Sequence, residues 1–344
     1  MIHSPVLAVK EIANIFRMLV DDNVKFVLTT HVNPDADGLG SELALHRFLK
    51  KLRKSSAILN HSETPANHAF MDYDNEIKKF DPEKDGKLVL GADVLVAVDM
   101  NNPSRLRSME KSFLESKARK VIIDHHLEAQ DFVDYQLIDL DSPATAEIVY
   151  KCLMAYDPNL LDKGIAEALY AAIMTDTGSF RFPRTDGDIH RVTAHLLDVG
   201  VDPNYIYNNL YEQNSIGRTR LLGEVLQNVQ LAYEGKVAYF SITQEQLKKN
   251  RVVPDETEQF ANYAGAISGV VVSIFFMELP DGIKISFRSK GDVSVNELAK
   301  LYGGGGHKNA AGARLFGAHL DEIIPRVLKD ASRILPSKNI SEEK

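Results

Sequence analysis

One imidazole and two carboxylates lie close together near the N-terminus, at His31, Asp35 and Asp37. An apolar run over residues 27–30 precedes them, and a helical pattern over residues 42–52 follows. Imidazole nitrogens and carboxylate oxygens, without thiolates, suit divalent cations such as Mn²⁺, Mg²⁺, Fe²⁺ or Zn²⁺. The pattern therefore predicts a metal-binding loop at the end of a buried strand.

Two aspartates later in the chain follow predicted elements. Asp99 comes directly after an apolar strand over residues 94–98, a position where an aspartate also serves as a helix cap or turn residue. Asp176 comes after a predicted helix over residues 165–174. Helix C-termini favour cations over anions, so a carboxylate placed there indicates a cation nearby.

Asp124, His125 and His126 are consecutive and follow a predicted strand over residues 120–123. A lone buried histidine is more often structural than a ligand. Two adjacent histidines beside an aspartate at a strand end favour a metal or phosphate role instead. Asp124 can accept a ring N–H and thereby fix the tautomer of a ligating histidine.

Together these groups are more numerous than the ligands that one divalent ion needs. Two ions about 3.5–4 Å apart, bridged by a carboxylate, would use most of them. Two-metal sites of this type mostly cleave phosphate esters or anhydrides. The candidate ligands of such a site are His31, Asp35, Asp37, Asp99, His125, His126 and Asp176.

Four consecutive glycines, residues 303–306, precede His307 and Lys308. Successive glycines cost backbone entropy, so we expect a close approach of the backbone to a partner, although a flexible loop is the alternative. Backbone N–H groups with the His307 and Lys308 side chains could hold a phosphate. Arg288 and Lys290, at the end of a predicted strand, could add donors or could be a solvated strand end.

The elements that position these residues predict an α/β fold. In the first half of the chain, short apolar strands alternate with helical patterns, which indicates a parallel sheet covered on both faces. Ligands of such sheets collect at the carboxyl ends of the strands. The polar segment over residues 60–86 is predicted to be a connecting arm outside the core.

The sequence pattern changes at residue 229. Strand patterns over residues 237–242, 270–278 and 283–288 include a hairpin signal, and helical patterns follow. We therefore expect a catalytic α/β domain over residues 1–190, a helical linker over 191–228 and a smaller mixed α/β domain over 229–336, with residues 337–344 frayed.

Composition excludes several classes of protein. The chain has 344 residues and a net charge of −8, which disfavours tight binding of long nucleic acids but permits a small anionic substrate in a local cationic site. Cys152 is the only cysteine, so no intrachain disulfide can form. No signal peptide or membrane-spanning run is evident, and we expect a cytoplasmic protein that does not bind membranes.

Five motifs in this order resemble those of the DHH phosphoesterase superfamily. They are His-x-x-x-Asp-x-Asp from His31, the aspartate after a strand at Asp99, Asp-His-His from Asp124, Thr-Asp-Thr-Gly-Ser-Phe around Asp176, and Gly-Gly-Gly-His-x-x-Ala-Ala-Gly from Gly304. The last is similar to the signature of the DHH-associated C-terminal domain. The resemblance covers nearly the whole chain, and its layout is closest to the branch of nanoRNases and phosphatases of 3′-phosphoadenosine-5′-phosphate (pAp).

The resemblance implies a role for each matching residue. One metal would be held by His31, Asp35 and Asp99, and the second by Asp37, Asp99, His125 and Asp176. His126, oriented by Asp124, would contact the phosphate or the leaving oxygen. The substrate's terminal phosphate or nucleotide would be held by Arg288, Gly304, Gly305, Gly306 and His307.

The implied enzyme is a Mn²⁺-dependent hydrolase with two metal ions per chain, although Mg²⁺ or another divalent ion is an alternative. Its substrates would be very short RNA oligonucleotides, including linear dinucleotides, and nucleotide bisphosphates such as pAp. Alternatives are a RecJ-like single-strand exonuclease, a pyrophosphate or polyphosphate hydrolase, and a non-catalytic nucleotide sensor. A homodimer is compatible with the sequence.

Overall fold

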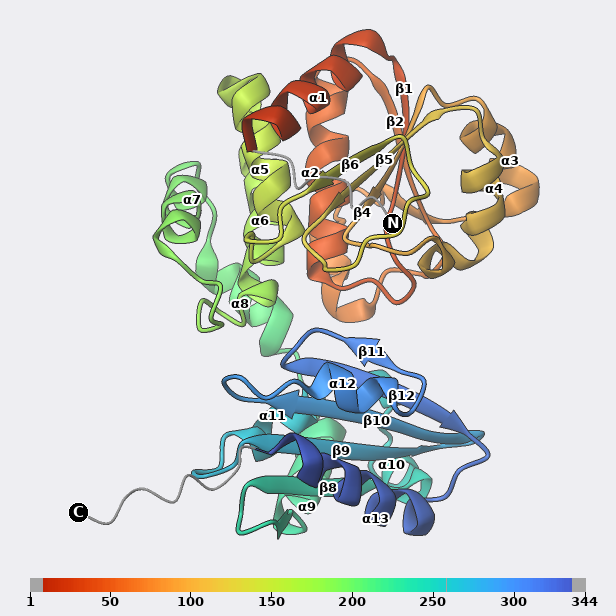
Figure 1. Cartoon of the computed structure of the whole chain (residues 1–344). Coiled ribbons are helices and arrows are strands. Elements are labelled where there is room, and N and C mark those ends of the chain that lie inside the picture. Colours follow the sequence, from red (N-terminus) through yellow and green to blue (C-terminus); the bar gives the residue numbers. More distant parts are fainter. Residues whose placement is uncertain (1–8, 258, 336–344) are drawn as a thin grey trace. The chain divides into compact units, whose positions relative to one another are not determined.

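The computed structural model describes residues 9–257 and 259–335. The chain forms two compact units (Figure 1). Unit 1 is Met1–Gln213 and unit 2 is Asn214–Lys344. The segment over residues 337–344, which was expected to fray, lies outside the described residues. In the described part of the chain, no helix combines the length and the apolar character needed to cross a membrane.

Unit 1 is built on a six-stranded parallel sheet with the order β3-β2-β1-β4-β5-β6. The order reverses between β1 and β4, and ligand sites of such sheets lie outside the carboxyl ends of the strands at this point. The predicted parallel α/β architecture is confirmed. The strands are β1 (Lys25–Thr29), β2 (Ser55–Asn60), β3 (Ile77–Lys79), β4 (Val94–Val98), β5 (Arg119–Asp124) and β6 (Tyr135–Ile138).

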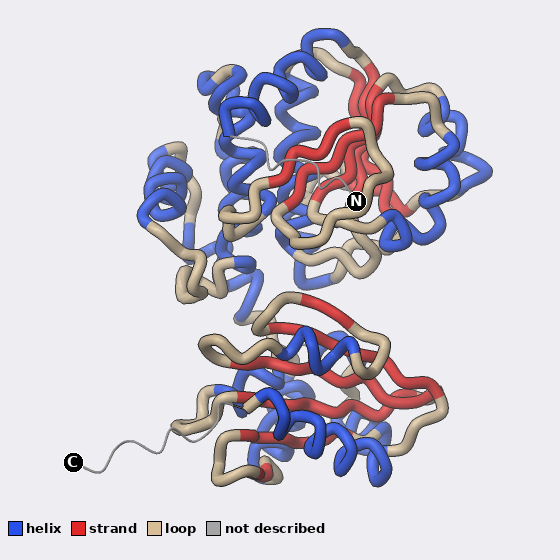
Figure 2. The backbone as a smooth tube through the Cα atoms, viewed as in Figure 1, coloured by secondary structure: helices blue, strands red, loops and turns tan. Residues whose placement is uncertain are grey.

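Helices cover both faces of this sheet, which is why its central strands are apolar along their whole length (Figure 2). Val94 and Val96 pack into one core, whereas Leu95 and Ala97 pack into the other. The first core contains α1 (Val9–Asp22), α2 (Ala36–Lys51), α5 (Thr145–Tyr156) and α6 (Lys163–Asp176). The second contains α3 (Pro82–Leu90), the 3₁₀ turn η2 (Pro103–Met109) and α4 (Glu110–Glu115).

The helical segment that was expected to link the domains is shared between the two units. Helices α7 (Gly187–Asp198) and α8 (Pro203–Tyr211) bury Leu196 and Leu210 in the core of unit 1. Helix α9 (Ile216–Gln227) buries Leu221 in unit 2. The compact units therefore meet in sequence between α8 and α9.

The prediction that residues 60–86 form an arm outside the core is wrong. This segment contains the 3₁₀ turn η1 (Ala66–Met71), strand β3 and the start of α3. Met71 and Phe80 are buried in the two cores of unit 1. These elements are short, and β3 is an edge strand, so most of their side chains are polar and only a few are buried. The polar composition of the segment therefore hides its secondary structure.

Unit 2 contains a mixed six-stranded sheet with the order β11-β12-β10-β9-β8-β7. Neighbouring strands are antiparallel except β8 and β9, which are parallel. The predicted mixed α/β class of this part is confirmed. The strands are β7 (Gln230–Ala232), β8 (Val237–Ile242), β9 (Val272–Leu279), β10 (Gly282–Ser289), β11 (Gly305–Gly306) and β12 (Ala310–Phe316).

The predicted hairpin joins β9 to β10, with Leu279 paired to Gly282. Gly282 has φ +149°, and a Cβ there would lie 2.0 Å from the Leu315 carbonyl oxygen, so only glycine fits. One face of the sheet is covered by α9, α10 (Gln244–Asn250) and α11 (Phe260–Gly265). The other face is covered by α12 (Val295–Lys300) and α13 (Leu320–Ala331).

Candidate metal centre

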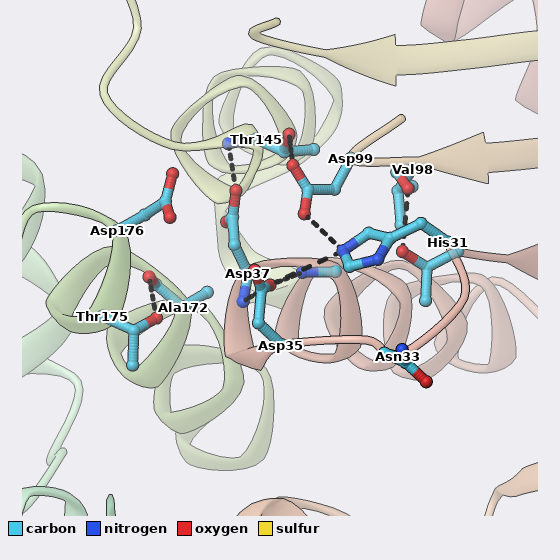
Figure 3. A network of polar contacts seen from close by, with 12 residues as sticks. His31, Asn33, Asp35, Asp37, Val98, Asp99, Thr145, Ala172, Thr175 and Asp176 are labelled. Atoms are coloured by element: carbon cyan, nitrogen blue, oxygen red, sulfur yellow. Dashed lines mark hydrogen bonds and ion pairs between the residues drawn. The ribbon is translucent and has the colours of Figure 1, made fainter. Parts of the chain in front are cut away.

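The loop after β1 turns His31 toward two aspartates (Figure 3). The buried His31 ring donates through Nδ1 to the Val32 carbonyl oxygen at 2.9 Å, which leaves Nε2 available as an acceptor or ligand. Nε2 lies 3.2 Å from Asp99 Oδ2 and 3.9 Å from Asp35 Oδ1. Burial opposes protonation of this ring, but Asp99 and Asp35 raise the pKa of His31 overall.

Asp35 and Asp37 are positioned by the first turn of α2. Asp35 is the N-cap residue, and its side chain accepts hydrogen bonds from the backbone N–H groups of Asp37 and Gly38. Asp37 is fully buried and accepts from the N-terminus of α5, with Oδ2 2.7 Å from Thr145 N and Oδ1 3.0 Å from Ala146 N. A carboxylate at a helix N-terminus is electrostatically favourable, so α5 fixes the position of Asp37.

Asp99 lies at the middle of the centre, directly after β4. Its backbone has φ +58°, a left-handed conformation that is uncommon for residues other than glycine, although asparagine and aspartate adopt it more often than most. Its Oδ1 accepts from Thr145 Oγ1 at 3.2 Å and lies 3.7 Å from His125 Nε2 and 3.6 Å from His126 Nδ1. Burial raises the pKa of Asp99, but the hydrogen bond to His31 and the other nearby imidazoles outweigh it and lower the pKa.

The Asp-His-His triplet follows β5 and brings two imidazoles beside Asp99. His126 Nδ1 donates to Asp124 Oδ1 at 2.7 Å, the contact expected from the sequence. His125 Nδ1 donates to the Ser142 carbonyl oxygen at 3.2 Å and presents Nε2 to Asp176 Oδ2 at 3.1 Å. Burial lowers the pKa of His125, yet the aspartates around it, Asp176 foremost, raise the pKa to about 10.

The donor set fits divalent metal ions. The possible ligand atoms of His31, Asp35 and Asp99 lie within 4.8 Å of one another, and so do those of Asp37, His125 and Asp176. Burial and the charges of Asp99 and Asp176 raise the pKa of Asp37 well above its usual value, because these carboxylates repel one another. A divalent cation would remove that repulsion, and oxygen and imidazole ligands match such ions. The histidine and aspartate clusters, most of them buried, are therefore consistent with a divalent-metal site.

Several residues that support the centre were not predicted from the sequence. Asn60, at the end of β2, accepts from Thr30 N at 3.1 Å and donates to Glu42 Oε1 at 2.6 Å. Thr30 Oγ1 donates to the Val98 carbonyl oxygen at 2.9 Å, which ties the residue before His31 to the residue before Asp99. Of these residues, only Glu42 could have been noticed from the sequence, because it is a glutamate within the apolar pattern of a helix. It is buried in the structure.

In unit 2, the glycine segment is an edge strand as well as a loop. Residues Gly305 and Gly306 pair with β12, and a Cβ on Gly304 would lie 2.1 Å from the Gly312 carbonyl oxygen. The close approach expected of these glycines is therefore to the protein's own backbone. The Gly304 N–H donates to the Ala299 carbonyl oxygen, and the His307 N–H donates to the Ala310 carbonyl oxygen. These two amides are therefore already hydrogen-bonded within unit 2.

The cationic side chains predicted to bind substrate lie on the same unit. Arg288, at the end of β10, is half-buried and donates through Nε to Asn262 Oδ1 at 3.2 Å, which orients the guanidinium. His307 is exposed, and Lys308 pairs with Asp292 at 2.8 Å. Lys290 is exposed at the end of the same strand.

Comparisons with known proteins identify relatives over most of the chain. The DHH family, N-terminal domain, matches residues 25–173, and the DHHA1 domain matches residues 234–335. A bifunctional oligoribonuclease and PAP phosphatase NrnA from Thermus thermophilus is 33% identical over 303 residues, 88% of this chain and 87% of that protein. The protein of the same description from Bacillus subtilis is 30% identical over 84% of this chain and 89% of its own length. The crystal structure of an exopolyphosphatase-related protein from Bacteroides fragilis has a TM-score of 0.90 at 31% identity, and the match covers 96% of this chain and 97% of that one.

Proposed function

This chain belongs to the DHH family of metal-dependent phosphoesterases, and we propose that it hydrolyses very short oligoribonucleotides to mononucleotides and pAp to AMP and phosphate. Linear dinucleotides are included among the oligoribonucleotides. The relatives from Thermus thermophilus and Bacillus subtilis, described by both activities, support this specificity. The two ligand groups that meet at Asp99 carry the proposal, because hydrolysis of phosphate esters is the main chemistry of paired divalent ions.

We assign the ligands as the sequence predicted. His31, Asp35 and Asp99 would hold one Mn²⁺, and the second would be held by Asp37, Asp99, His125 and Asp176. When bound, the ions would lower the pKa of a water molecule and stabilise charge on the phosphoryl oxygens.

The other predicted residues act on the substrate. The hydrogen bond from His126 to Asp124 fixes the ring, so that Nε2 faces away from Asp124 and can contact the phosphate or the leaving oxygen. In unit 2, Arg288 and His307 would hold the terminal phosphate or nucleotide, with the backbone of Gly304, Gly305 and Gly306 beside it. Arg288 suits this role because a guanidinium binds phosphate through two parallel hydrogen bonds.

A substrate panel with Mn²⁺ tests the proposal. The panel contains pAp, a 5′-phosphorylated dinucleotide, a five-nucleotide RNA, a long single-stranded DNA, pyrophosphate and polyphosphate. We expect mononucleotides from the two short RNAs and phosphate from pAp, with little turnover of the long DNA. Preferential cleavage of the DNA would indicate a RecJ-like exonuclease and contradict the proposal.

Polyphosphate hydrolysis is a second candidate function, because the structural relative from Bacteroides fragilis is described as exopolyphosphatase-related. Release of phosphate from polyphosphate, with no release of mononucleotides from the short RNAs, would favour it. The native metal, the cytoplasmic location and the homodimer stay predictions. Metal analysis of purified protein, fractionation of cells and light scattering in solution test them in turn.

A further inference from the structure

Arg105 lies on the turn that follows the aspartate at the middle of the centre. The 3₁₀ turn η2 begins four residues after Asp99, and Asn102 caps it by accepting from Ser104 N at 2.9 Å. The Arg105 carbonyl oxygen accepts from Val32 N at 2.8 Å. This backbone hydrogen bond attaches Arg105 to the residue next to His31, at the carboxyl edge of the sheet.

The Arg105 side chain is half-buried and makes no hydrogen bond or ion pair with the residues that the structure describes. Arg47 shows the usual arrangement for a guanidinium removed from water. It donates to Glu76 Oε2, to the Gly164 carbonyl oxygen and to the Met71 carbonyl oxygen at 2.8–3.1 Å. A guanidinium has five N–H donors, and withdrawing them partly from water without acceptors is unfavourable.

The Arg105 backbone is one hydrogen bond away from the loop that carries His31, and its turn begins four residues after Asp99. A guanidinium without acceptors at the carboxyl edge of the sheet can bind an anion that reaches the metal centre. The aspartates of the centre make no ion pair with Arg105, so its N–H donors are available to an anion from outside the protein.

We propose that Arg105 binds the substrate phosphate in the catalytic unit, with its guanidinium hydrogen-bonded to the non-bridging oxygens of the phosphate group at the metal centre. This inference rests on the proposed phosphoesterase function. It adds a phosphate contact from unit 1 to those that Arg288 and His307 would make from unit 2. Phosphate is the anion whose geometry matches the paired donors of a guanidinium.

The test compares R105M, R105K and R119Q in the Mn²⁺-loaded full chain. R105M removes the charge and keeps a long side chain, and R105K keeps the charge but not the paired donors. R119Q is the matched control, because Arg119 is exposed at the start of β5, at the opposite edge of the sheet. The readouts are kcat/KM for pAp and a phosphorylated dinucleotide, the Kd values of AMP and adenosine, the bound Mn²⁺ and the Tm.

We expect R105M to lower kcat/KM about 100-fold. AMP binding weakens, while adenosine binding, bound Mn²⁺ and the Tm stay as in the wild type. R105K falls between R105M and the wild type, and R119Q matches the wild type. Wild-type kcat/KM and AMP affinity in R105M would overturn the inference. A loss of activity in R105M that follows a loss of Tm or Mn²⁺ would show a structural role and would overturn it too.

Failure of the proposed function gives a different result. A wild-type protein that hydrolyses none of these substrates refutes that function. The difference in affinity between AMP and adenosine, and its dependence on Arg105, then decides the inference separately.

Discussion

Single residues decide how charge is arranged in the metal centre, and Asp99 contacts groups from both ligand sets. An Asp-to-Asn change at this position can leave the backbone unchanged, since asparagine also tolerates the left-handed conformation that Asp99 adopts at φ +58°. Its carboxylate faces His31 at 3.2 Å and His125 at 3.7 Å. The negative charge of Asp99 therefore faces imidazoles from both predicted ligand sets.

D99N should abolish nearly all turnover and reduce the Mn²⁺ content, because one carboxylate is lost from both ligand sets. We expect turnover to fall by more than about 100-fold, beyond the effect typical of residues that only support a ligand. Metal analysis and initial rates measure the two effects, and circular dichroism checks that the fold is retained. D22N, at a largely exposed aspartate of unit 1, is the control. Near-normal turnover in D99N would refute the bridging assignment.

Glu42 makes stability depend on pH. Burial raises the pKa of Glu42 well above its usual value, although the hydrogen bond from Asn60 opposes this. Between the unfolded and folded pKa values, the folded protein holds a proton that the unfolded chain has released. Folding therefore takes up a proton, and the free energy of unfolding falls as pH rises through this range.

E42Q removes this titration and should gain stability relative to the wild type as pH rises. The difference between the two proteins should grow by up to about 1.4 kcal/mol per pH unit above the ordinary range of a glutamate. Urea unfolding between pH 5 and 8 measures it, with E115Q at an exposed glutamate as the control. A constant difference across this range would show that Glu42 is ionised in the folded protein.

At the scale of elements, the centre depends on how closely helices α2 and α6 approach each other. Gly40 lies on α2, and a Cβ there would be 2.4 Å from the Ala168 carbonyl oxygen on α6. These two helices carry Asp37 and Asp176, which face His125 together. The glycine thus sets the separation of two predicted ligands.

G40A should push α2 away from α6 and weaken both stability and metal binding. Overpacking of this kind costs about 1–3 kcal/mol, and the shift of Asp37 should raise the Kd for Mn²⁺. Urea unfolding and Mn²⁺ titration measure the two effects. G223A is the matched control, because Gly223 lies in α9 with no atom within 4 Å of its added Cβ. There, alanine should stabilise the protein by up to about 1 kcal/mol. Equal effects of the two changes would contradict the role given to Gly40.

At the scale of the whole molecule, the predicted functions are divided between the two units. The predicted metal ligands all belong to unit 1, and the cationic and glycine residues predicted to bind substrate belong to unit 2. Changes in unit 2 should therefore act first on substrate binding and only secondarily on the chemical step.

H307A should raise KM for a phosphorylated dinucleotide about tenfold, because one charge-assisted contact to phosphate is lost. The Mn²⁺ content should stay unchanged, since His307 is not among the predicted metal ligands. Steady-state kinetics and metal analysis measure these effects. H319A, at another exposed histidine of unit 2, is the control. A fall in kcat with an unchanged KM would show that His307 acts in the chemical step.

Much of the fold was predictable because its signals are local. The strand over Val94–Val98 was predicted with its observed bounds, since a fully buried strand is a continuous apolar run. The hairpin before Gly282 was predicted from its turn residues. Strand β3 and the turn η1 were missed, because short edge elements bury too few side chains to show a periodic pattern.

The sequence by itself placed the predicted metal ligands at the ends of strands and helices. His31, Asp99 and Asp124 each follow or end a recognisable apolar strand, and this is a property of a few consecutive residues. The tertiary structure alone decided which groups face each other. The order of the sheet sets β1 beside β4, and packing brings Thr145 of α5 to Asp37 and Asn60 of β2 to Thr30. Contacts between residues so distant in the chain depend on the packing of whole elements, which no local pattern records.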